Sequence, residues 1–397
     1  MKRILYIQYT NPGGYPPLEH SSRILAKADW KVLFLGTGTS GSNSLDFPMH
    51  ENITVRRMSF CGGGWRQKLH FGSYCFWVLW SILTWRPDWV YASDPFSCPL
   101  AALAICMPGV RVLYHEHDAP ANNSGSQFLR FILRARRYVA RHAEICVLPN
   151  AARLERFKLE CGPLKASECV WNCPALSEVS GPREEVAASV WLLYHGSIVP
   201  ERLPPTALDA LALLPPTVRM RVVGYETVGS RGYVGELQRR ARESGLESRV
   251  EFLGTLPQRS DLLRTTLRSD IGLALMPLNS TDHNCETMAG ASNKAFDYLA
   301  CGVPLIVSDL AEWKNFFVEP GYGLACDPTK PESIAGAISK LIGNLEVMRQ
   351  MGDAGRLRIL SEWNYENKFF PVFQFLSATE SSQASVPSRE KSSEANT

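Results

Sequence analysis

The sequence has little net charge and no apolar run long enough to span a membrane. Its 42 Lys and Arg residues against 39 Asp and Glu leave a formal charge of +3, too small to favour nucleic acid as a partner of the whole chain. The longest apolar stretch, residues 71–85, falls short of the roughly 20 residues that a spanning helix needs. Residues 1–3 run directly into a strand-like segment, so we expect no signal peptide and a cytoplasmic protein.

Cysteine pairs and metal-binding spacings are also lacking. The 11 cysteines are spread singly along the chain, many within apolar segments, as expected for reduced, buried thiols in the cytosol. The only cluster is Cys161, Cys169 and Cys173, and no second pair or histidine lies near it, so we predict no zinc site. We also predict no metal site at His115 and His117, which lie two residues apart on an extended segment.

What the sequence has is a regular alternation of strand and helix signals. Short apolar runs alternate with segments of helical periodicity over residues 4–148 and again over 190–307. This alternation predicts an α/β fold with two doubly wound parallel sheets, and a chain of 397 residues is long enough for two domains. The polar stretch 177–185, which contains Gly181 and Pro182, predicts the linker between them.

We place a Rossmann-like N-terminal domain at residues 1–178 and a Rossmann-like C-terminal domain at 186–357. A helical stretch at 358–376 ends the folded part. The tail at 377–397 is rich in Ser, Glu and Ala with almost no apolar residues, so we predict that it is disordered.

One segment in the second half combines a complete helix pattern with a following strand. Ser292 and Asn293 are residues that begin helices, because a short polar side chain can accept from the free backbone N–H groups. Gly302 can take the left-handed conformation that ends a helix, and Pro304 prevents it from resuming. The apolar run 303–307 is then a strand typical of a buried parallel sheet.

The same helix carries two charged residues on one face. Lys294 and Asp297 lie three residues apart. A cation and free N–H groups at a helix N-terminus suit a phosphate, and a carboxylate one turn deeper can accept two ribose hydroxyls. The segment therefore predicts a site for a nucleotide diphosphate.

The segment also resembles the nucleotide-binding element of retaining glycosyltransferases of family 4, which have the GT-B fold. Asp297 lies where the second of two glutamates belongs, residues 300–304 match the turn that follows, and the first glutamate would fall at Ala289. The resemblance implies two Rossmann-like domains that face a cleft. It also implies that the helix at 358–376 crosses back onto the first domain.

Loops in both halves extend the resemblance. Gly13 and Gly14 follow the first strand, permit close approach of the backbone to a ligand, and match the glycine loop of GT-B enzymes. The run from Gly196 resembles a family motif in which Arg202 is the cation that grips the diphosphate, while Ser197 stands where many members have an arginine.

Three further loops match parts of the family site. Gly224 and Leu256 lie in loops that hold the nucleobase in family 4. The resemblance places His117 near the sugar, where a neutral imidazole can bind a hydroxyl or shuttle a proton, and Asp118 can orient it or bind the acceptor. A buried, hydrogen-bonded histidine is the structural alternative, as turn-forming glycine is for Gly224.

The resemblance implies a metal-independent hexosyltransferase that needs no cofactor. It would move a sugar from a nucleotide diphosphate sugar to a saccharide or lipid-linked acceptor with retention, in the synthesis of cell-surface polysaccharides or glycoconjugates. We expect Arg202 and Lys294 to act in catalysis on the departing diphosphate. Two alternatives remain. One is an epimerase or hydrolase of the same donor, and the other is a degenerate subunit that only binds it, which the missing glutamate at Ala289 and the missing arginine at Ser197 favour.

Two segments of the first half allow a peripheral contact with the membrane. Residues 71–85 are rich in aromatic residues and fit either a buried helix or an interfacial one. The arginine-rich segment 130–141 fits a solvated helix face. Side by side, the two would suit docking on the anionic inner face of the plasma membrane, where a lipid-linked acceptor would lie.

Overall fold

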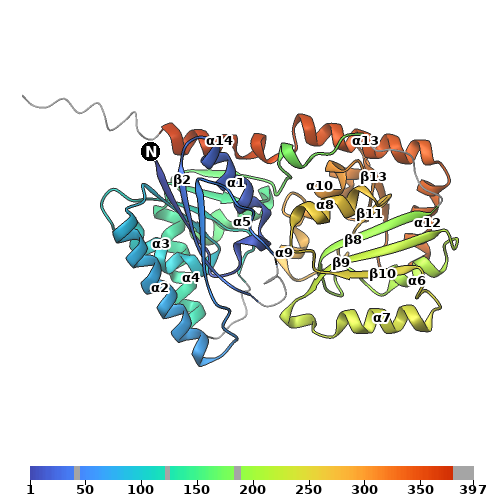
Figure 1. Ribbon diagram of the computed structural model, residues 1–397, viewed down its shortest axis with the longest axis horizontal. Coiled ribbons are helices and arrows are strands. Elements are labelled where there is room, and N and C mark those ends of the chain that lie inside the picture. Colours follow the sequence, from blue (N-terminus) through green and yellow to red (C-terminus); the bar gives the residue numbers. More distant parts are fainter. Residues whose placement is uncertain (40–44, 121–125, 183–188, 379–397) are drawn as a thin grey trace, which may run out of the picture.

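The computed structural model describes residues 1–39, 45–120, 126–182 and 189–378. The chain forms two α/β domains, each with a parallel sheet between helices (Figure 1). The first sheet has the order β3-β2-β1-β4-β5-β6-β7, with strands β1 Arg3–Ile7, β2 Lys31–Thr37, β3 Ile53–Met58, β4 Trp89–Ser93, β5 Arg111–His115, β6 Ile145–Leu148 and β7 Ser167–Cys169. The second has the order β10-β9-β8-β11-β12-β13, with β8 Val190–Ile198, β9 Val218–Glu226, β10 Val250–Gly254, β11 Ile271–Ala274, β12 Leu305–Ser308 and β13 Gly323–Cys326.

Helices cover both faces of the first sheet. Residues Ile4 and Leu5 of β1 point to opposite faces, as neighbours on a strand do. The face of Leu5 packs against α2 Trp65–Trp85, α3 Cys98–Ile105, α4 Gln127–His142 and α5 Ala151–Cys161. The face of Ile4 packs against α1 Pro16–Lys27 and the last helix, α14 Tyr365–Ala378.

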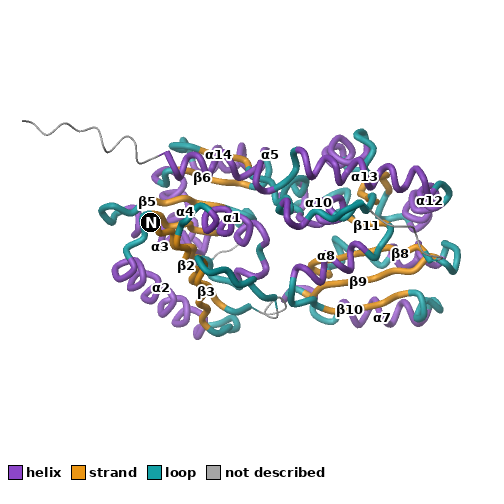
Figure 2. Tube along the Cα trace, turned by 45° about the horizontal axis from the view of Figure 1, so that its top comes forward, coloured by secondary structure: helices purple, strands orange, loops and turns teal. Residues whose placement is uncertain are grey.

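The second sheet is covered in the same way (Figure 2). One face packs against α6 Thr206–Ala212, α7 Tyr233–Glu243 and α12 Pro331–Ile342. The other packs against α8 Arg259–Leu267 and α10 Asn293–Ala300, with α13 Leu345–Ser361 beside α10 and α12. Two short helices, α9 His283–Glu286 and α11 Ala311–Trp313, lie in the connections.

The C-terminal part crosses from one domain to the other. Helix α13 belongs to the second domain, and α14 follows it onto the first, where Tyr365, Phe369 and Val372 join the core around Ile4 (Figure 1). The expected single helical stretch is therefore two helices, with a break at residues 362–364. The first two residues of the expected tail, 377 and 378, belong to α14, and the rest of the tail lies outside the described residues, as do residues 183–185 of the expected linker.

The ends of α10 were placed correctly from sequence, but one detail was wrong. Ser292 is the N-cap residue in an extended conformation, yet its side chain makes no capping hydrogen bond. Gly302 has φ 65° and ends the helix as predicted. The N-terminal N–H groups of α10 are thus left without the side-chain acceptor that we expected from Ser292.

Two strands of the structure were not predicted from the sequence. β7 has only three residues, and β13 contains no β-branched residue, so neither gives a strand pattern. No described helix is long and apolar enough to cross a membrane. All eleven cysteines are free thiols, and within the described part of the chain no group of three or more His, Cys, Asp or Glu residues is arranged to hold a metal ion.

Candidate functional site

A cleft of about 580 Å³ lies between the two domains. In each sheet the strand order reverses at one point, between β1 and β4 and between β8 and β11, and ligands of such sheets bind beyond the carboxyl ends of the strands there. All thirteen residues that the sequence singled out line this cleft: Gly13, Gly14, His117, Asp118, Gly196, Ser197, Arg202, Gly224, Leu256, Ser292, Asn293, Lys294 and Asp297. Their individual roles stay predictions.

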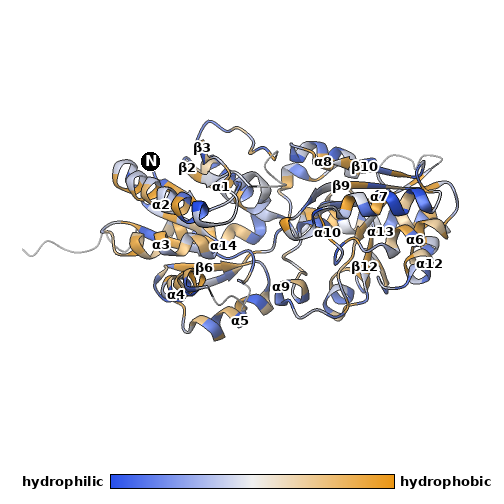
Figure 3. Cartoon of the chain, turned by 90° about the horizontal axis from the view of Figure 1, so that it is seen from below, coloured by the Kyte–Doolittle hydropathy of each residue, from blue (hydrophilic) through white to orange (hydrophobic). Residues whose placement is uncertain are grey.

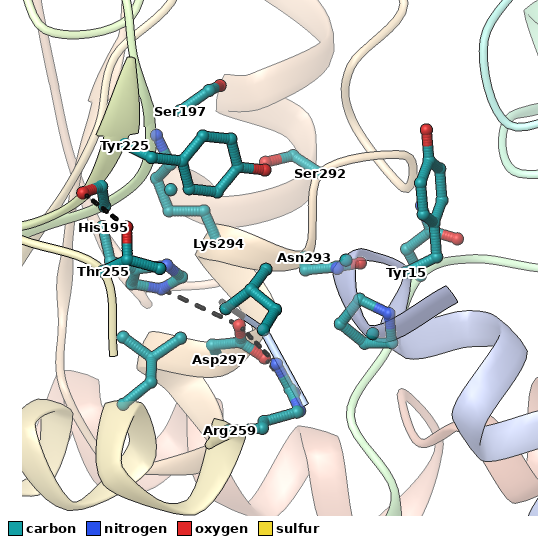
Figure 4. A pocket seen from close by; sticks show the side chains of 18 of the residues that line it. Tyr15, His195, Ser197, Tyr225, Thr255, Arg259, Ser292, Asn293, Lys294 and Asp297 are labelled. Atoms are coloured by element: carbon teal, nitrogen blue, oxygen red, sulfur yellow. Dashed lines mark hydrogen bonds and ion pairs between the residues drawn. The ribbon is translucent and has the colours of Figure 1, made fainter. Parts of the chain in front are cut away.

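Lys294 is a buried cation that faces the cleft (Figure 4). Its side chain is 6% exposed, and its ammonium makes no hydrogen bond or ion pair with any described residue. The Nζ atom lies 3.8 Å from the centre of the Tyr194 ring. Burial, and then the charge of Arg202, lower the pKa of Lys294 well below its usual value. An anion in the cleft would satisfy an ammonium that the protein itself leaves unpaired.

Arg202 shares this part of the cleft with Lys294. Its guanidinium donates to Oγ of Ser197 over 3.0 Å. Ser197 stands where many family members have a second arginine, and here it positions Arg202. Asn293, at the start of α10, has a buried side-chain oxygen without a partner among the described residues. Two cations and a helix N-terminus therefore converge on one region.

The surrounding structure explains why glycine stands at position 196 of β8 and at position 224 of β9. Gly196 has φ 110°, and a Cβ atom there would lie 3.6 Å from Cε of Lys294. A Cβ atom on Gly224 would lie only 1.8 Å from the carbonyl oxygen of Gly196. Gly224 lines the cleft, but the pairing of β8 with β9 alone already requires glycine there.

Asp297 is already paired in this structure. It is 1% exposed, and its two oxygens accept from Nη2 and Nη1 of Arg259 over 2.6 and 3.2 Å. Arg259 also donates to both oxygens of Glu178, over 2.5 and 3.0 Å. Asp297 is therefore not the open ribose acceptor that we expected, and ribose hydroxyls would have to use the lone pairs that Arg259 leaves.

Neighbouring groups extend this network across the domain boundary. Nε2 of His20, on α1, lies 3.0 Å from Oε2 of Glu178, and Nε2 of His195 lies 3.7 Å from Oδ2 of Asp297. Burial opposes the ionised form of Glu178, but the charges of Arg259 and His20 hold its pKa well below the usual value. Burial, followed by Lys294 and Arg259, lowers the pKa of His195, so that the imidazole is neutral at pH 7.

His117 lies on the opposite wall of the cleft. Its backbone N–H donates to Oδ1 of Asp94 over 2.9 Å, and its ring packs against Tyr15 and His115. Neither ring nitrogen has a hydrogen-bond partner among the described residues. Burial lowers the pKa of His117 to about 4, so the ring is neutral and able to bind a hydroxyl. The alternative of a buried, hydrogen-bonded histidine does not describe this ring.

Arg153 joins the His117 loop to the segment that precedes α10. It is buried on α5 and donates to the carbonyl oxygen of His117 and to Oδ1 of Asp118. The same guanidinium donates to the carbonyl oxygens of Asn284 and Thr287. Asp118 remains about two-thirds exposed, which leaves it open to a second ligand.

The position of the missing glutamate is part of the junction between the domains. Ala289 is buried, and its carbonyl oxygen accepts from Nδ2 of Asn150 over 2.5 Å. Glu286, three residues earlier in the sequence, is about half exposed, has Oε2 3.8 Å from Nδ1 of His283, and does not line the cleft. The carboxylates that line it are Glu19, Asp46, Asp118 and Asp297.

The sequence analysis missed the partners that complete the site. Arg259 follows β10 and Tyr15 precedes α1, and both line the cleft. Arg259 is 38 residues from Asp297, so no local pattern connects them. A signal for Arg259 was nevertheless available, since a charged residue just after a strand of a parallel sheet lies at the ligand-binding edge.

Comparison with known proteins identifies the family of both domains. The family model described as "Glycosyl transferases group 1" matches residues 184–358, and the one described as "Glycosyl transferase 4-like domain" matches residues 18–158. No curated protein sequence matches the chain significantly.

Solved structures show the same fold along nearly the whole chain. HepE of Anabaena, in a crystal structure with UDP and glucose, is 18% identical with a TM-score of 0.71, over 95% of this chain and 100% of that chain. Sucrose-phosphate synthase of Thermosynechococcus elongatus is 14% identical with a TM-score of 0.72, over 96% and 100%. WaaG, a glycosyltransferase involved in lipopolysaccharide biosynthesis, is 13% identical with a TM-score of 0.66, over 93% and 98%. The predicted GT-B fold is confirmed, and the two family models show that the chain combines a glycosyl transferase 4-like domain with a C-terminal domain of the glycosyl transferases group 1.

Proposed function

We propose that this protein transfers a sugar from a nucleotide diphosphate sugar to the hydroxyl of a saccharide or lipid-linked acceptor. The observation that carries the proposal is the buried, unpaired ammonium of Lys294 beside Arg202 at the N-terminus of α10. A charge so placed costs stability unless an anion binds it. The similar HepE binds UDP and glucose in its crystal structure, which supports a nucleotide-sugar donor here.

The proposed chemistry uses the cations in place of a metal ion. Arg202, Lys294 and the N–H groups of α10 would stabilise the charge that develops on the departing diphosphate. We expect retention, by front-face attack of the acceptor hydroxyl assisted by the leaving phosphate. His117, neutral and unpaired, would hydrogen-bond a sugar hydroxyl, with Asp118 beside it toward the acceptor.

We expect the enzyme to work in the cytoplasm, in polysaccharide or glycoconjugate synthesis, and to meet lipid-linked acceptors at the anionic inner face of the plasma membrane.

One observation favours a second candidate, a subunit that binds the donor without transfer: the buried Ala289 cannot supply the family's first carboxylate. Incubation with donor alone detects an epimerase or hydrolase, because either changes the sugar. Addition of acceptor then separates a transferase, which consumes the donor, from a degenerate subunit, which leaves it intact.

The donor site is tested by ligand-induced stabilisation. In a panel of nucleoside diphosphates, at least one should stabilise the wild type by about 2.7 kcal/mol at 100 times its Kd. Arg202→Ala should lose this stabilisation, because its guanidinium would grip the diphosphate, whereas the control Arg239→Ala, on the exposed surface of α7, should keep it. Thermal shift measures both, and no shift with any nucleotide would refute the proposal.

His117 should affect turnover more than donor binding. We expect His117→Ala to lower kcat roughly tenfold, the cost of one lost hydrogen bond, with little change in nucleotide affinity. The pKa of about 4 predicts that this residue adds no pH dependence between pH 6 and 8. Steady-state kinetics with donor and acceptor checks both statements. A loss confined to nucleotide affinity would place His117 elsewhere in the mechanism.

A further inference from the structure

Helix α2 has two apolar stripes on opposite sides. The first consists of Phe71, Tyr74, Val78 and Ile82, spaced three or four apart, and is buried against the first sheet. The second consists of Trp65, Leu69, Phe76, Trp80 and Leu83, also at helical spacing, and each of these side chains is between 58% and 72% exposed. A surface helix needs only one apolar stripe to fold, so the second one is not explained by the core.

Helix α4 presents a line of cations to solvent. Arg130, Arg134, Arg137 and Arg141 follow at spacings of four, three and four, and all are exposed on one side of the helix. Phe131 and Tyr138 are exposed beside them, at 53% and 38%. Arg134 and Arg137 make no ion pair or hydrogen bond with any described residue. Neither helix contains an Asp or Glu, and α2 adds Arg66 and Lys68 next to Trp65.

The two helices belong to one outer layer. Both cover the same face of the first sheet, with α3 between them, and Figure 3 shows apolar residues along α2 and α3. A cluster of rings joins their N-terminal ends: Phe71 of α2 and Phe128 of α4 both contact Phe96 and one another. Tyr9 contacts Phe71 and Phe96 as well and is the neighbour of Thr10, which lines the cleft.

We propose that the exposed sides of α2 and α4, here called the α2–α4 face, dock on an anionic lipid bilayer. Aromatic and aliphatic side chains would enter the interface, and the arginines would pair with lipid phosphates. Charge complementarity favours an anionic bilayer over a second copy of the chain. If two copies met through this face, arginines would lie against arginines, and neither α2 nor α4 has an acidic residue to pair with them. The ring cluster would then hold the acceptor side of the cleft close to the membrane.

Vesicle co-sedimentation of the full chain tests the proposal. The wild type should bind vesicles of phosphatidylglycerol and phosphatidylethanolamine, bind phosphatidylcholine vesicles far less, and release with rising salt. Arg134→Glu/Arg137→Glu should lower affinity about 30-fold or more, since each arginine near such a surface contributes about fivefold. Phe76→Ser/Trp80→Ser should lower it by a similar factor through lost apolar burial.

The control variants change the same types of residue on surfaces outside the α2–α4 face. Arg239→Glu/Arg242→Glu changes two exposed arginines of α7, and Leu357→Ser/Phe370→Ser changes two exposed apolar residues of α13 and α14. Both controls should bind vesicles as the wild type does. Equal losses in variants and controls, equal binding to neutral vesicles, or a dimer that Phe76→Ser/Trp80→Ser dissociates would overturn the proposal.

The docking surface is independent of the donor site. Unchanged stabilisation by nucleotide in the α2–α4 variants would show that they are folded and that only the membrane contact is lost. A chain that binds no nucleotide but still binds anionic vesicles would refute the proposed function and leave the docking surface intact.

Discussion

Lys294→Met should weaken nucleoside diphosphate binding about 100-fold, the loss typical when one partner of a buried charge pair is removed. The same substitution should stabilise the ligand-free protein by about 1–3 kcal/mol, because a methionine of similar length needs no partner in a buried place. A residue that lowers stability and raises affinity is one retained for its ligand. Titration calorimetry and urea unfolding measure the two effects, and Lys340→Met on exposed α12 is the control.

The pH dependence of this variant has a definite sign. The pKa of Lys294 is lowered in the folded protein and near 10.5 in the unfolded chain. Between these two values the unfolded chain binds more protons, so wild-type stability should rise with pH there, and the Met variant should lose this rise. Above the lowered pKa, diphosphate binding should take up a proton. Binding heats that do not vary with the ionisation enthalpy of the buffer would contradict this.

Arg259→Met should be the most destabilising single substitution in the cleft. It leaves Asp297 and Glu178, both largely buried, without the cation that bridges them, a change that costs about 3–5 kcal/mol when one partner of a buried ion pair is removed. Urea unfolding measures the loss. The control is Arg264→Met on the exposed side of the same helix, whose ion pair with Asp261 is at the surface.

Acid should rescue the Arg259→Met variant in part. Burial raises the pKa of Asp297 even beside Arg259, and loss of the arginine should raise it further. A carboxyl whose folded pKa is raised stabilises the fold at low pH and loses that contribution as pH rises through the folded pKa. The gap to wild type should therefore be smaller at pH 5 than at pH 8, and Arg259→Met/Asp297→Asn should recover stability at pH 8. Equal gaps at both pH values would contradict the pairing.

The sequence predicted the architecture because its signals are local. Gly302 and Pro304 mark the end of α10, and the apolar strands and their turns are each encoded within a few residues. The thirteen site residues line one cleft because they lie at or beyond the carboxyl ends of strands of parallel sheets, and these ends meet. The resemblance to glycosyltransferases of family 4, rather than local pattern, pointed to His117, Arg202 and Leu256.

What failed depended on contacts between distant segments. The pairing of Asp297 with Arg259 joins two helices of the second domain, and the pairing of Arg259 with Glu178 reaches the connection between the domains. The pattern of α2 predicted a helix but not which of its two apolar stripes faces the sheet, since both have the same period. Likewise, the sequence showed that Ala289 lacks the family's carboxylate, but not that its carbonyl oxygen accepts from Asn150 at the junction of the domains.

Arg153 connects the two walls of the cleft by hydrogen bonds. Its guanidinium holds the backbone at His117 on one wall and the backbone at Asn284 and Thr287 on the other, in the segment that leads into α10. Any rotation of one domain against the other must move these walls together or break those bonds. Under the proposed function, any factor by which the donor changes the affinity for the acceptor must equal the factor by which the acceptor changes the affinity for the donor.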